Sequence, residues 1–533
     1  MKIILRTLFI ALATGQCMYG QGFTSPAVQW NIPAVLDYDE YHISDDFHAV
    51  IDMNGDGKPD LVDTENQSTE SVSDVFINGQ QKYWKVYLNT GSGFSATATQ
   101  WNIPAVLDNS DYRLASQYHT VIDMNGDGKP DLVDSENQST ESVSDVFMNG
   151  QQKYWKVYLN TGSGFSATAT QWNIPAVLDY ADYVVANEYH TVIDLNGDGK
   201  PDLIDSENQS TESVSDVFMN GQQKYWKVYL NTGSGFSATA TQWNIPAVLD
   251  SGDYRVANEY HTVADMNGDG KPDLVDTENQ STESVSDVFM NGQQKHWKVY
   301  LNNGSGFNAT AVQWNIPAVS DNADYRFAND YHTVIDFNGD GKPDFIDSEN
   351  QSTESVSDVF MNGNQKYWKV YLNNGSGFNA TSVQWNIPAT LDNSDYRVSW
   401  DIHNVIDFNG DHKPDLVDSE NEATQTVSDV FMNGQQKYWR VYLNNDPTLE
   451  SASFATGTAS IVAYPNPATD RLTIASSYDI ESVSVYNMVG QQIWTSDVRA
   501  GEIGIDISGW QSGTYLIRVS ADQTQNALKI VKR

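Results

Sequence analysis

The hydrophobic and polar positions of this chain form short runs that recur along most of its length. Runs such as YHTVID and DLVDSE flank an acidic turn and are rich in β-branched residues bounded by turn residues, as is typical of strands. In YWKVYL of the first copy, Trp84 and Val86 fall on one face of a strand, whereas Tyr83 and Lys85 fall on the other. Because both faces carry large apolar groups, the pattern predicts sheets packed between two neighbours.

A segment of 71 residues is repeated six times along the chain. The motif WNIPA begins at Trp30, Trp101, Trp172, Trp243, Trp314 and Trp385. In each unit VFMNGQQKYWKVYL, or a close variant, places Asn-Gly between two β-type runs, which predicts a hairpin. QWNIPAV predicts a further strand, whose proline favours an edge. Four strands with a tight acidic turn are typical of a propeller blade, and the surplus length lies in the polar arm ENQSTESVSD.

The two ends of the array complement each other. The sixth unit stops at YLNND, and the N-terminal QGFTSPAVQWNIPAV supplies the segment that it lacks. We therefore expect residues 22–36 to complete the sixth blade and to remove exposed sheet edges. The predicted fold is all-β, a six-bladed β-propeller of 71-residue repeats followed by a small β-sandwich. An open β-solenoid is the alternative.

The acidic turn DMNGDGKPD has the donors of a calcium loop. Asp52, Asn54 and Asp56 occupy positions 1, 3 and 5, Asp60 occupies position 9, and the Lys58 carbonyl at position 7 is the expected backbone ligand. The corresponding residues of the other copies are Asp123, Asn125, Asp127, Lys129 and Asp131; Asp194, Asn196, Asp198, Lys200 and Asp202; Asp265, Asn267, Asp269, Lys271 and Asp273; Asp336, Asn338, Asp340, Lys342 and Asp344; and Asp407, Asn409, Asp411, Lys413 and Asp415. Up to six Ca²⁺ ions are thus predicted.

The same turn has two other interpretations. An EF-hand or dockerin-like loop would use the acid Asp63 at position 12, but its flanks should be helical, whereas here they are strand-like, and Pro59 lacks an N–H. A turn of Asp, Asn and Gly without metal is the plainer alternative.

The loops resemble the calcium-binding turns of FG-GAP/VCBS-type repeats, which form the blades of integrin α-subunit propellers and occur in many secreted bacterial proteins. The resemblance covers residues 30–445 and implies Ca²⁺ between the first two strands of each blade. Integrin propellers have seven blades, of which only some bind calcium, whereas here all six units keep the loop. His412 replaces glycine in the sixth loop, so we expect that site to be the weakest.

Net charge and the N-terminus limit the functional classes. A net charge of −40 argues against nucleic acid and anionic membranes as partners. Residues 1–20 predict a signal peptide, cleaved after Gly15 or Gly20. Cys17 is the only cysteine, so the exported protein has no disulfide framework. Gln16 before it argues against lipidation, and no other segment predicts a membrane span.

Other repeated residues have two interpretations each. Trp30, Trp84 and their copies fit an inter-blade core better than sugar-stacking platforms. A histidine four residues before each loop, at His48 in the first copy, fits a structural hydrogen bond. The polar arm suits a glycan or protein partner, or is a solvated loop. The chain contains no catalytic motif such as GxSxG or HExxH. A pair of catalytic carboxylates, as in a glycosidase, remains an alternative.

A different domain follows the repeats. Residues 446–459 form a predicted linker, and residues 460–533 carry AYPNPATDRLTI, VSVYNMVGQQIW, IDISGW and GTYLIRV in order. This set resembles the type A C-terminal sorting domain of type IX secretion substrates in Bacteroidota. The resemblance implies the type IX machinery as a partner and a secreted or outer-surface location.

The sequence therefore predicts a non-catalytic, calcium-binding surface module for binding or adhesion, with a glycan or surface protein as ligand. A polysaccharide-active enzyme and a purely structural surface or matrix component are the alternatives.

Overall fold

The structure is a computed structural model of the 533-residue chain. The structure describes residues 21–33, 42–43, 48–64, 75–104, 113–115, 118–135, 146–175, 184–186, 189–206, 217–246, 255–257, 260–277, 288–317, 325–328, 331–348, 359–388, 397–398, 403–419, 430–445, 461–464, 471–487, 492–510, 513–521 and 524–532. The predicted signal peptide, the linker and the polar arms lie outside these ranges. The described residues form strands and turns without a helix, which confirms the all-β class.

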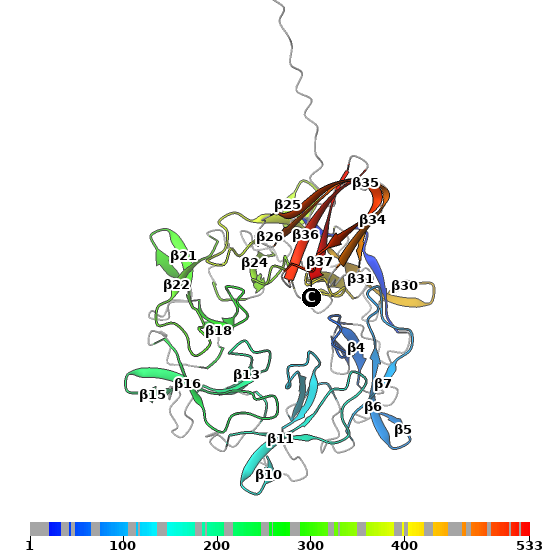
Figure 1. Ribbon diagram of the computed structural model, residues 1–533. Coiled ribbons are helices and arrows are strands. Elements are labelled where there is room, and N and C mark those ends of the chain that lie inside the picture. The colour runs from blue at the N-terminus through cyan, green and yellow to red at the C-terminus, as the bar shows by residue number, and fades with distance from the viewer. Residues whose placement is uncertain are drawn as a thin grey trace, which may run out of the picture. The chain divides into compact units, whose positions relative to one another are not determined.

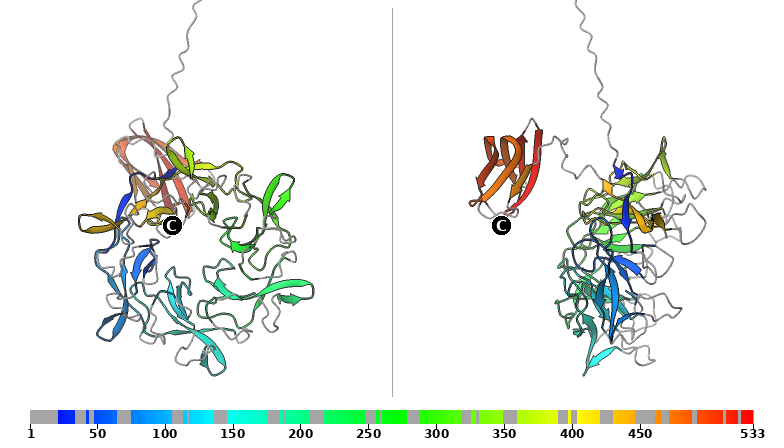
Figure 2. Two further views of the ribbon diagram at one scale, coloured as in Figure 1. Left: turned by 180° about the vertical axis from the view of Figure 1, so that it is seen from behind. Right: turned by 90° about the vertical axis from the view of Figure 1, so that its right-hand side faces the viewer.

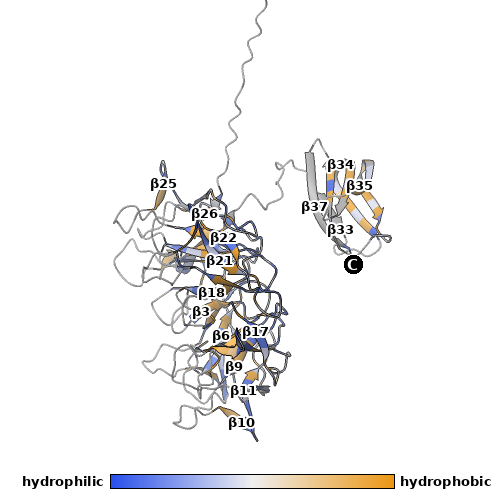
Figure 3. Ribbon diagram, turned by 90° about the vertical axis from the view of Figure 1, so that its left-hand side faces the viewer, coloured by the Kyte–Doolittle hydropathy of each residue, from blue (hydrophilic) through white to orange (hydrophobic). Residues whose placement is uncertain are grey.

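The chain divides into two compact units, residues 1–445 and 446–533. In the first unit, the sheets of the six repeats follow one another around a ring (Figure 1; Figure 2 shows it from behind). Hydrophobic residues lie along strands such as β6 and β9 (Figure 3). The repeats and the C-terminal part of the chain each have their own buried hydrophobic residues.

Each repeat forms one antiparallel sheet. In the first, the order is β3–β4–β6–β7, and the short β5 pairs with the start of β6. The strands are β3 (His48–Ile51), β4 (Asp60–Asp63), β5 (Phe76–Asn78), β6 (Gln81–Tyr87) and β7 (Thr99–Asn102). The predicted Asn-Gly hairpin joins β5 to β6, and Gly79 takes the positive φ of 65° that this turn requires.

The next four repeats have the same strands at the same spacing. They are β8 (His119–Ile122), β9 (Asp131–Asp134), β10 (Phe147–Asn149), β11 (Gln152–Tyr158) and β12 (Thr170–Asn173); β13 (His190–Ile193), β14 (Asp202–Asp205), β15 (Phe218–Asn220), β16 (Gln223–Tyr229) and β17 (Thr241–Asn244); β18 (His261–Ala264), β19 (Asp273–Asp276), β20 (Phe289–Asn291), β21 (Gln294–Tyr300) and β22 (Val312–Asn315); β23 (His332–Ile335), β24 (Asp344–Asp347), β25 (Phe360–Asn362), β26 (Gln365–Tyr371) and β27 (Val383–Asn386).

The sixth sheet is completed by the N-terminal segment, as predicted. Its own strands are β28 (His403–Ile406), β29 (Asp415–Asp418), β30 (Phe431–Asn433) and β31 (Gln436–Tyr442). Strand β2 (Val28–Asn31) supplies the fourth position, with Trp30 opposite Trp439. Strand β1 (Gly22–Phe23) joins the fifth sheet instead, where it pairs in parallel with β27 and antiparallel with β32 (Asn444–Asn445) of the sixth repeat. The first and last parts of the array are therefore joined by backbone hydrogen bonds.

Tryptophan and phenylalanine fill the space between neighbouring sheets. Trp84 and Trp101, opposite each other on β6 and β7, are fully buried. Phe165 of the next repeat meets both edge-on, with ring centroids 5.6 and 6.5 Å away. Phe94 of the first repeat contacts Trp439 of the sixth in the same way, at 5.7 Å. The repeats are thus linked in sequence order and from the first to the last.

The C-terminal unit is a separate antiparallel β-structure. Its strands are β33 (Ile461–Tyr464), β34 (Arg471–Asn487), β35 (Gln492–Asp506), β36 (Gly513–Ala521) and β37 (Thr524–Lys532). A register irregularity between Ala475 and Ile480 divides β34 into two halves. Leu472 from one half and Val485 from the other share one buried cluster. The two halves therefore enclose a common core.

Candidate metal sites

Each acidic turn joins the first two strands of its sheet, such as β3 and β4 in the first repeat. The sequence predicts the same position. In the first copy, Asp52 organises the turn by accepting hydrogen bonds from three backbone N–H groups. Its Oδ1 accepts from Gly55 at 2.8 Å and from Asp56 at 3.2 Å, and its Oδ2 accepts from Gly57 at 2.7 Å. The same three bonds recur in the other five copies, at 2.7 to 3.2 Å.

The polar groups at positions 3 and 5 are held in the same way. The Asn54 Oδ1 accepts from the Asp56 N–H at 2.8 Å, and the Asp56 Oδ1 accepts from the Lys58 N–H at 3.0 Å. The Lys58 ammonium lies 3.8 Å from the Asp56 Oδ2, with both groups partly exposed. The turn thus keeps its carboxylates in place through its own backbone.

The acid at position 9 is buried beneath the turn. Asp60 is fully buried, and its oxygens accept from the backbone N–H groups of Asn89 at 2.8 Å and Met53 at 3.2 Å. Burial raises its pKa to about 6, the two N–H groups lower it, and the charges of Asp52 and Asp56 raise it again. Ionising the Asp60 carboxyl group at this buried position therefore costs free energy.

The remaining copies behave alike. Burial is the leading cause that raises the pKa to about 6 for Asp131, Asp202 and Asp273, and to about 7 for Asp344 and Asp415. In the third copy, Asp202 is fully buried, and hydrogen bonds from the backbone N–H groups of Asn231 and Leu195 lower its pKa against the effect of burial.

The turns fit a hard cation in donor chemistry. Three carboxylates, one amide oxygen and one backbone carbonyl in a nine-residue turn are the ligands that Ca²⁺ prefers. The charges of Asp52 and Asp56 contribute to the raised pKa of Asp60. Among the residues that the structure describes, no three acidic, histidine or cysteine side chains converge as a complete metal site.

The acid at position 12 serves another role. Asp63 lies opposite Lys85 on β6, and its Oδ2 is 3.6 Å from the lysine ammonium. That ammonium also lies 3.7 Å from the centre of the Phe76 ring. Asp63 is therefore tied to the neighbouring strand, in agreement with the rejection of an EF-hand-like loop.

Sequence reasoning missed the asparagine that links one turn to the next. Asn160 is buried, and its Nδ2 donates to the Pro130 carbonyl of its own turn and to the Met53 carbonyl of the preceding repeat, each at 2.9 Å. The equivalent bonds to the preceding repeat run from Asn89 to Phe408, Asn231 to Met124, Asn302 to Leu195, Asn373 to Met266 and Asn444 to Phe337. The only signal was the sixfold YLN motif.

Neighbouring turns also touch through the glycine at position 4. A Cβ atom at Gly126 would lie 2.9 Å from the Lys200 Cγ and 3.1 Å from the Gly199 carbonyl oxygen of the next turn. At Gly410 in the sixth repeat, it would lie 3.0 Å from the Lys58 Cγ of the first. The six turns therefore form a continuous series of contacts that returns to its start.

The other repeated residues are structural, as predicted. The tryptophans of both sets are buried, which excludes them as exposed sugar platforms. The His48 Nε2 lies 2.7 Å from the His42 carbonyl oxygen, and the other five histidines meet a carbonyl six residues earlier in the same way. The polar arms, the other proposed ligand surface, lie outside the described residues.

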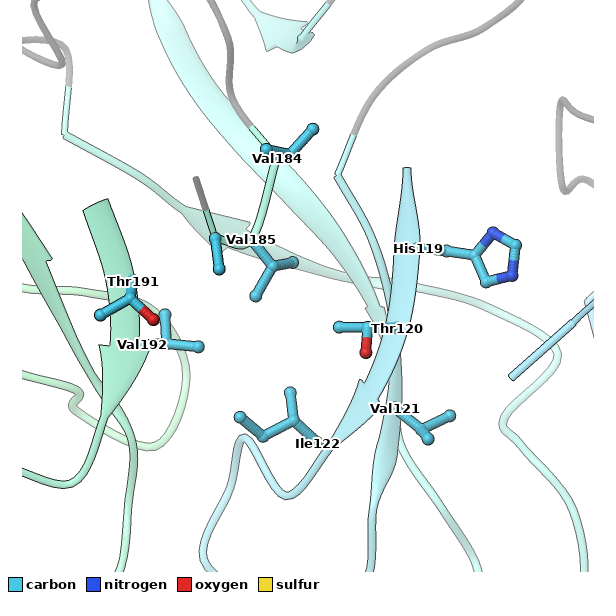
Figure 4. A pocket seen from close by; sticks show the side chains of 9 residues that line it. His119, Thr120, Val121, Ile122, Val184, Val185, Thr191 and Val192 are labelled. Carbon is cyan, nitrogen blue, oxygen red and sulfur yellow. The ribbon is translucent and has the colours of Figure 1, made fainter. Parts of the chain in front are cut away.

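A cavity of about 410 Å³ lies between the inner strands β8 and β13. Ile122, Val184, Val185 and Val192 line it, together with two threonines (Figure 4). His119 points away from it (Figure 4). Among the described lining residues most are aliphatic, and none is a carboxylate.

Comparison with known proteins assigns the C-terminal unit. Residues 462–533 match the family described as the secretion system C-terminal sorting domain. No curated protein matches the chain. Among solved structures, the chain is similar at 13% identity and a TM-score of 0.28 to PorZ of Porphyromonas gingivalis, described as an essential bacterial surface component of the type-IX secretion system. The alignment covers 95% of this chain and 60% of PorZ, and a likeness this weak supports no inference about fold or function.

The sorting domain indicates where the protein goes. It confirms the predicted export through the type IX machinery to the outer surface or the medium. In the part of the chain that the structure describes, no helix is long and apolar enough to cross a membrane.

Proposed function

We propose that the repeats form a closed, six-bladed, calcium-stabilised propeller that works as a non-catalytic binding module at the cell surface. The observation that carries the proposal is the sixfold acidic turn, in which Asp60 and its copies are buried next to other carboxylates. Without a cation, these charges repel one another in a chain that has a single cysteine and so no internal disulfide. The resemblance to FG-GAP/VCBS repeats agrees with this role.

The ligands proposed for each ion come from one turn. In the first copy, they are the side chains of Asp52, Asn54, Asp56 and Asp60 and the carbonyl of Lys58. When bound, Ca²⁺ supplies positive charge and no redox or acid–base chemistry. Asp52 keeps the turn folded by accepting three N–H groups, and Asp60 connects it to the core through Asn89. Ca²⁺ that binds the folded protein and not the unfolded chain would raise the free energy of unfolding by mass action.

A calcium titration tests the proposal directly. Isothermal titration of the chelator-treated, full-length mature protein should show about five strong sites and one weaker site. Calcium should also raise the melting temperature by many degrees over that in chelator. No heat of binding together with an unchanged melt would refute the proposal.

Binding is favoured over catalysis because the polar residues are repeated. The turns and their partners recur in every unit, whereas a catalytic site usually needs one asymmetric group of residues. Sixfold equivalence suits weak sites that act together. The competing enzyme hypothesis predicts hydrolysis of a polysaccharide that is lost when one acid in one repeat is replaced. Activity of that kind would overturn the non-catalytic role.

A further inference from the structure

A row of exposed amide side chains crosses the outer part of each sheet. In the first repeat, the Asn78 Nδ2 donates to the Gln100 Oε1 at 2.8 Å, and the Gln100 Nε2 donates to the Asn102 Oδ1 at 2.8 Å. Asn78 lies on β5 and the other two residues lie on β7, so the row joins strands on opposite sides of β6. Asn78 and Asn102 are exposed and Gln100 is half-buried. We call these three residues the amide row.

The row is complete in every repeat. The other rows are Asn149, Gln171 and Asn173; Asn220, Gln242 and Asn244; Asn291, Gln313 and Asn315; Asn362, Gln384 and Asn386; and Asn433, Gln29 and Asn31, with both bonds at 2.7 to 2.8 Å in each. In the sixth row, the N-terminal segment supplies the glutamine and the second asparagine. The ring is therefore needed to complete it.

The amide row is among the positions that do not vary between the six copies. Core positions vary, since Met53 becomes Leu195 and Phe337 in other copies. Exposed turn positions vary too, since Thr90 becomes Asn303. The amide row is identical in all six copies although its side chains are exposed or half-buried. The Asn-Gly hairpin accounts for Asn78 and its copies, whereas core packing does not account for the identity of the glutamine and of the second asparagine.

We propose that the amide rows bind a neutral polysaccharide, with one contact site per repeat. An amide carries both donors and acceptors, and the bonds inside the row orient the groups and leave further N–H donors at Asn102 and an acceptor at Asn78. Hydroxyl groups of sugars match this pattern. The row is uncharged and the chain carries a net charge of −40, which disfavours acidic polymers. The inference gives a ligand class to the proposed binding module and rests on that function.

Six equivalent sites suit a polymer rather than a single small sugar. Each exposed site alone is weak, because water competes for every hydrogen bond. A repeating polymer that meets several rows gains affinity through effective concentration. Loss of one row should thus matter little, and loss of all six should matter greatly.

The test measures retention of the full-length mature protein on immobilised dextran, mannan and cellulose, with alginate as the acidic polymer. The key variant replaces Gln29, Gln100, Gln171, Gln242, Gln313 and Gln384 by alanine. The matched control replaces the exposed apolar residues of the β5-type strands, namely Ile77, Met148, Met219, Met290, Met361 and Met432. Melting curves in calcium check that both variants fold.

Binding of the parent protein and the control to a neutral polymer, with a loss of about 10-fold or more in the sixfold glutamine variant, supports the proposal. The single variant Gln171→Ala should lose less than about 2-fold. Equal binding by the sixfold variant, preference for alginate, or no retention on any neutral polymer overturns it. If calcium still binds and raises the melting temperature in those cases, the amide-row inference fails while the calcium-stabilised fold stands.

Discussion

At the sixth acidic turn, a histidine holds the position that glycine occupies in the other five. His412 has φ of 68°, in the left-handed region where side chains other than glycine are strained. A Cβ at the equivalent Gly57 would meet nothing within 4 Å, so the cost comes from the backbone rather than from a clash. The His412 N–H still donates to the Asp407 Oδ2 at 2.7 Å.

Replacing this histidine should therefore stabilise the protein. We expect His412→Gly to raise the free energy of unfolding by about 1 kcal/mol and to bring the sixth calcium site to the affinity of the others. Calorimetry and a calcium titration of the variant measure the two effects. The reverse change, Gly128→His, is the matched control and should lower the free energy of unfolding. A less stable His412→Gly protein would show that the histidine makes a contact that outweighs its strain.

The buried acids give the calcium-free protein a distinctive pH dependence. Their folded pKa values of about 6 to 7 exceed the ordinary value of 3.8, so folding favours the protonated form. Their contribution to stability is full below about pH 4 and is lost as the pH rises through 6 to 7. In chelator, the melting temperature should be several degrees lower at pH 8 than at pH 5.

Two further measurements identify the cause of this pH dependence. Added calcium should remove most of the difference, because the cation compensates the carboxylates that have lost their protons. Asp131→Asn, which stays neutral, should weaken the dependence. A calcium-free melting temperature that rises from pH 5 to pH 8 would contradict the role of these acids.

Between elements, the buried asparagine at the end of each long strand connects neighbouring repeats. Asn160 donates to carbonyl groups of two different turns, and it donates its own N–H to Asp131 at 2.8 Å. One residue thus joins the buried acid, its turn and the preceding repeat. This arrangement couples the six turns to one another.

Asn160→Ala should cost about 2 kcal/mol, because two buried carbonyl groups lose their donor. It should also weaken calcium binding in both the first and the second repeat. Denaturant unfolding and a calcium titration provide the measurements. Thr161→Asn, which reproduces the residue found at Asn303 and Asn374, is the neighbouring control and should change little. Equal stability of Asn160→Ala and the control would remove the coupling role.

For the whole molecule, the repeats and the sorting domain are separate units with separate cores. The last repeat is already completed by β2, so it does not depend on the C-terminal unit for its strands. Removal of residues 460–533 should leave the repeats folded and hold them in the periplasm. Cell fractionation measures location, and the melting curve of the truncated protein measures folding. Export at the parent level would refute the sorting role.

Local features could be predicted because neighbouring residues decide them. The Asn-Gly dipeptide before Gln81 specifies the hairpin between β5 and β6, and the spacing of Asp52, Asn54 and Asp56 specifies the acidic turn. The alternation in β6 predicted large apolar groups packed on both faces of the strand, and Trp84 and Val86 on one face and Tyr87 on the other are indeed buried. Each of these patterns is complete within a few residues of sequence.

Links between repeats could not be predicted in this way. The residues around Asn160 in the sequence do not indicate that its side chain bonds to the Met53 carbonyl, since the two residues lie 107 positions apart. The pairing of Asp63 with Lys85 and the row from Asn78 to Gln100 likewise join separate strands. Their signal was sixfold recurrence, which marks a residue as part of the repeat without showing what it contacts.

By itself, the sequence determined the strand-forming unit, its number of copies, the acidic turn and the sorting domain, because backbone preference and periodicity act over short distances. Only the tertiary structure decided that Asp60 is buried, that Asn89 and its copies connect successive turns, and that exposed amides align across each sheet. These features arise when strands distant in the chain pack together, and packing sets the burial, pKa values and hydrogen-bond partners of their side chains.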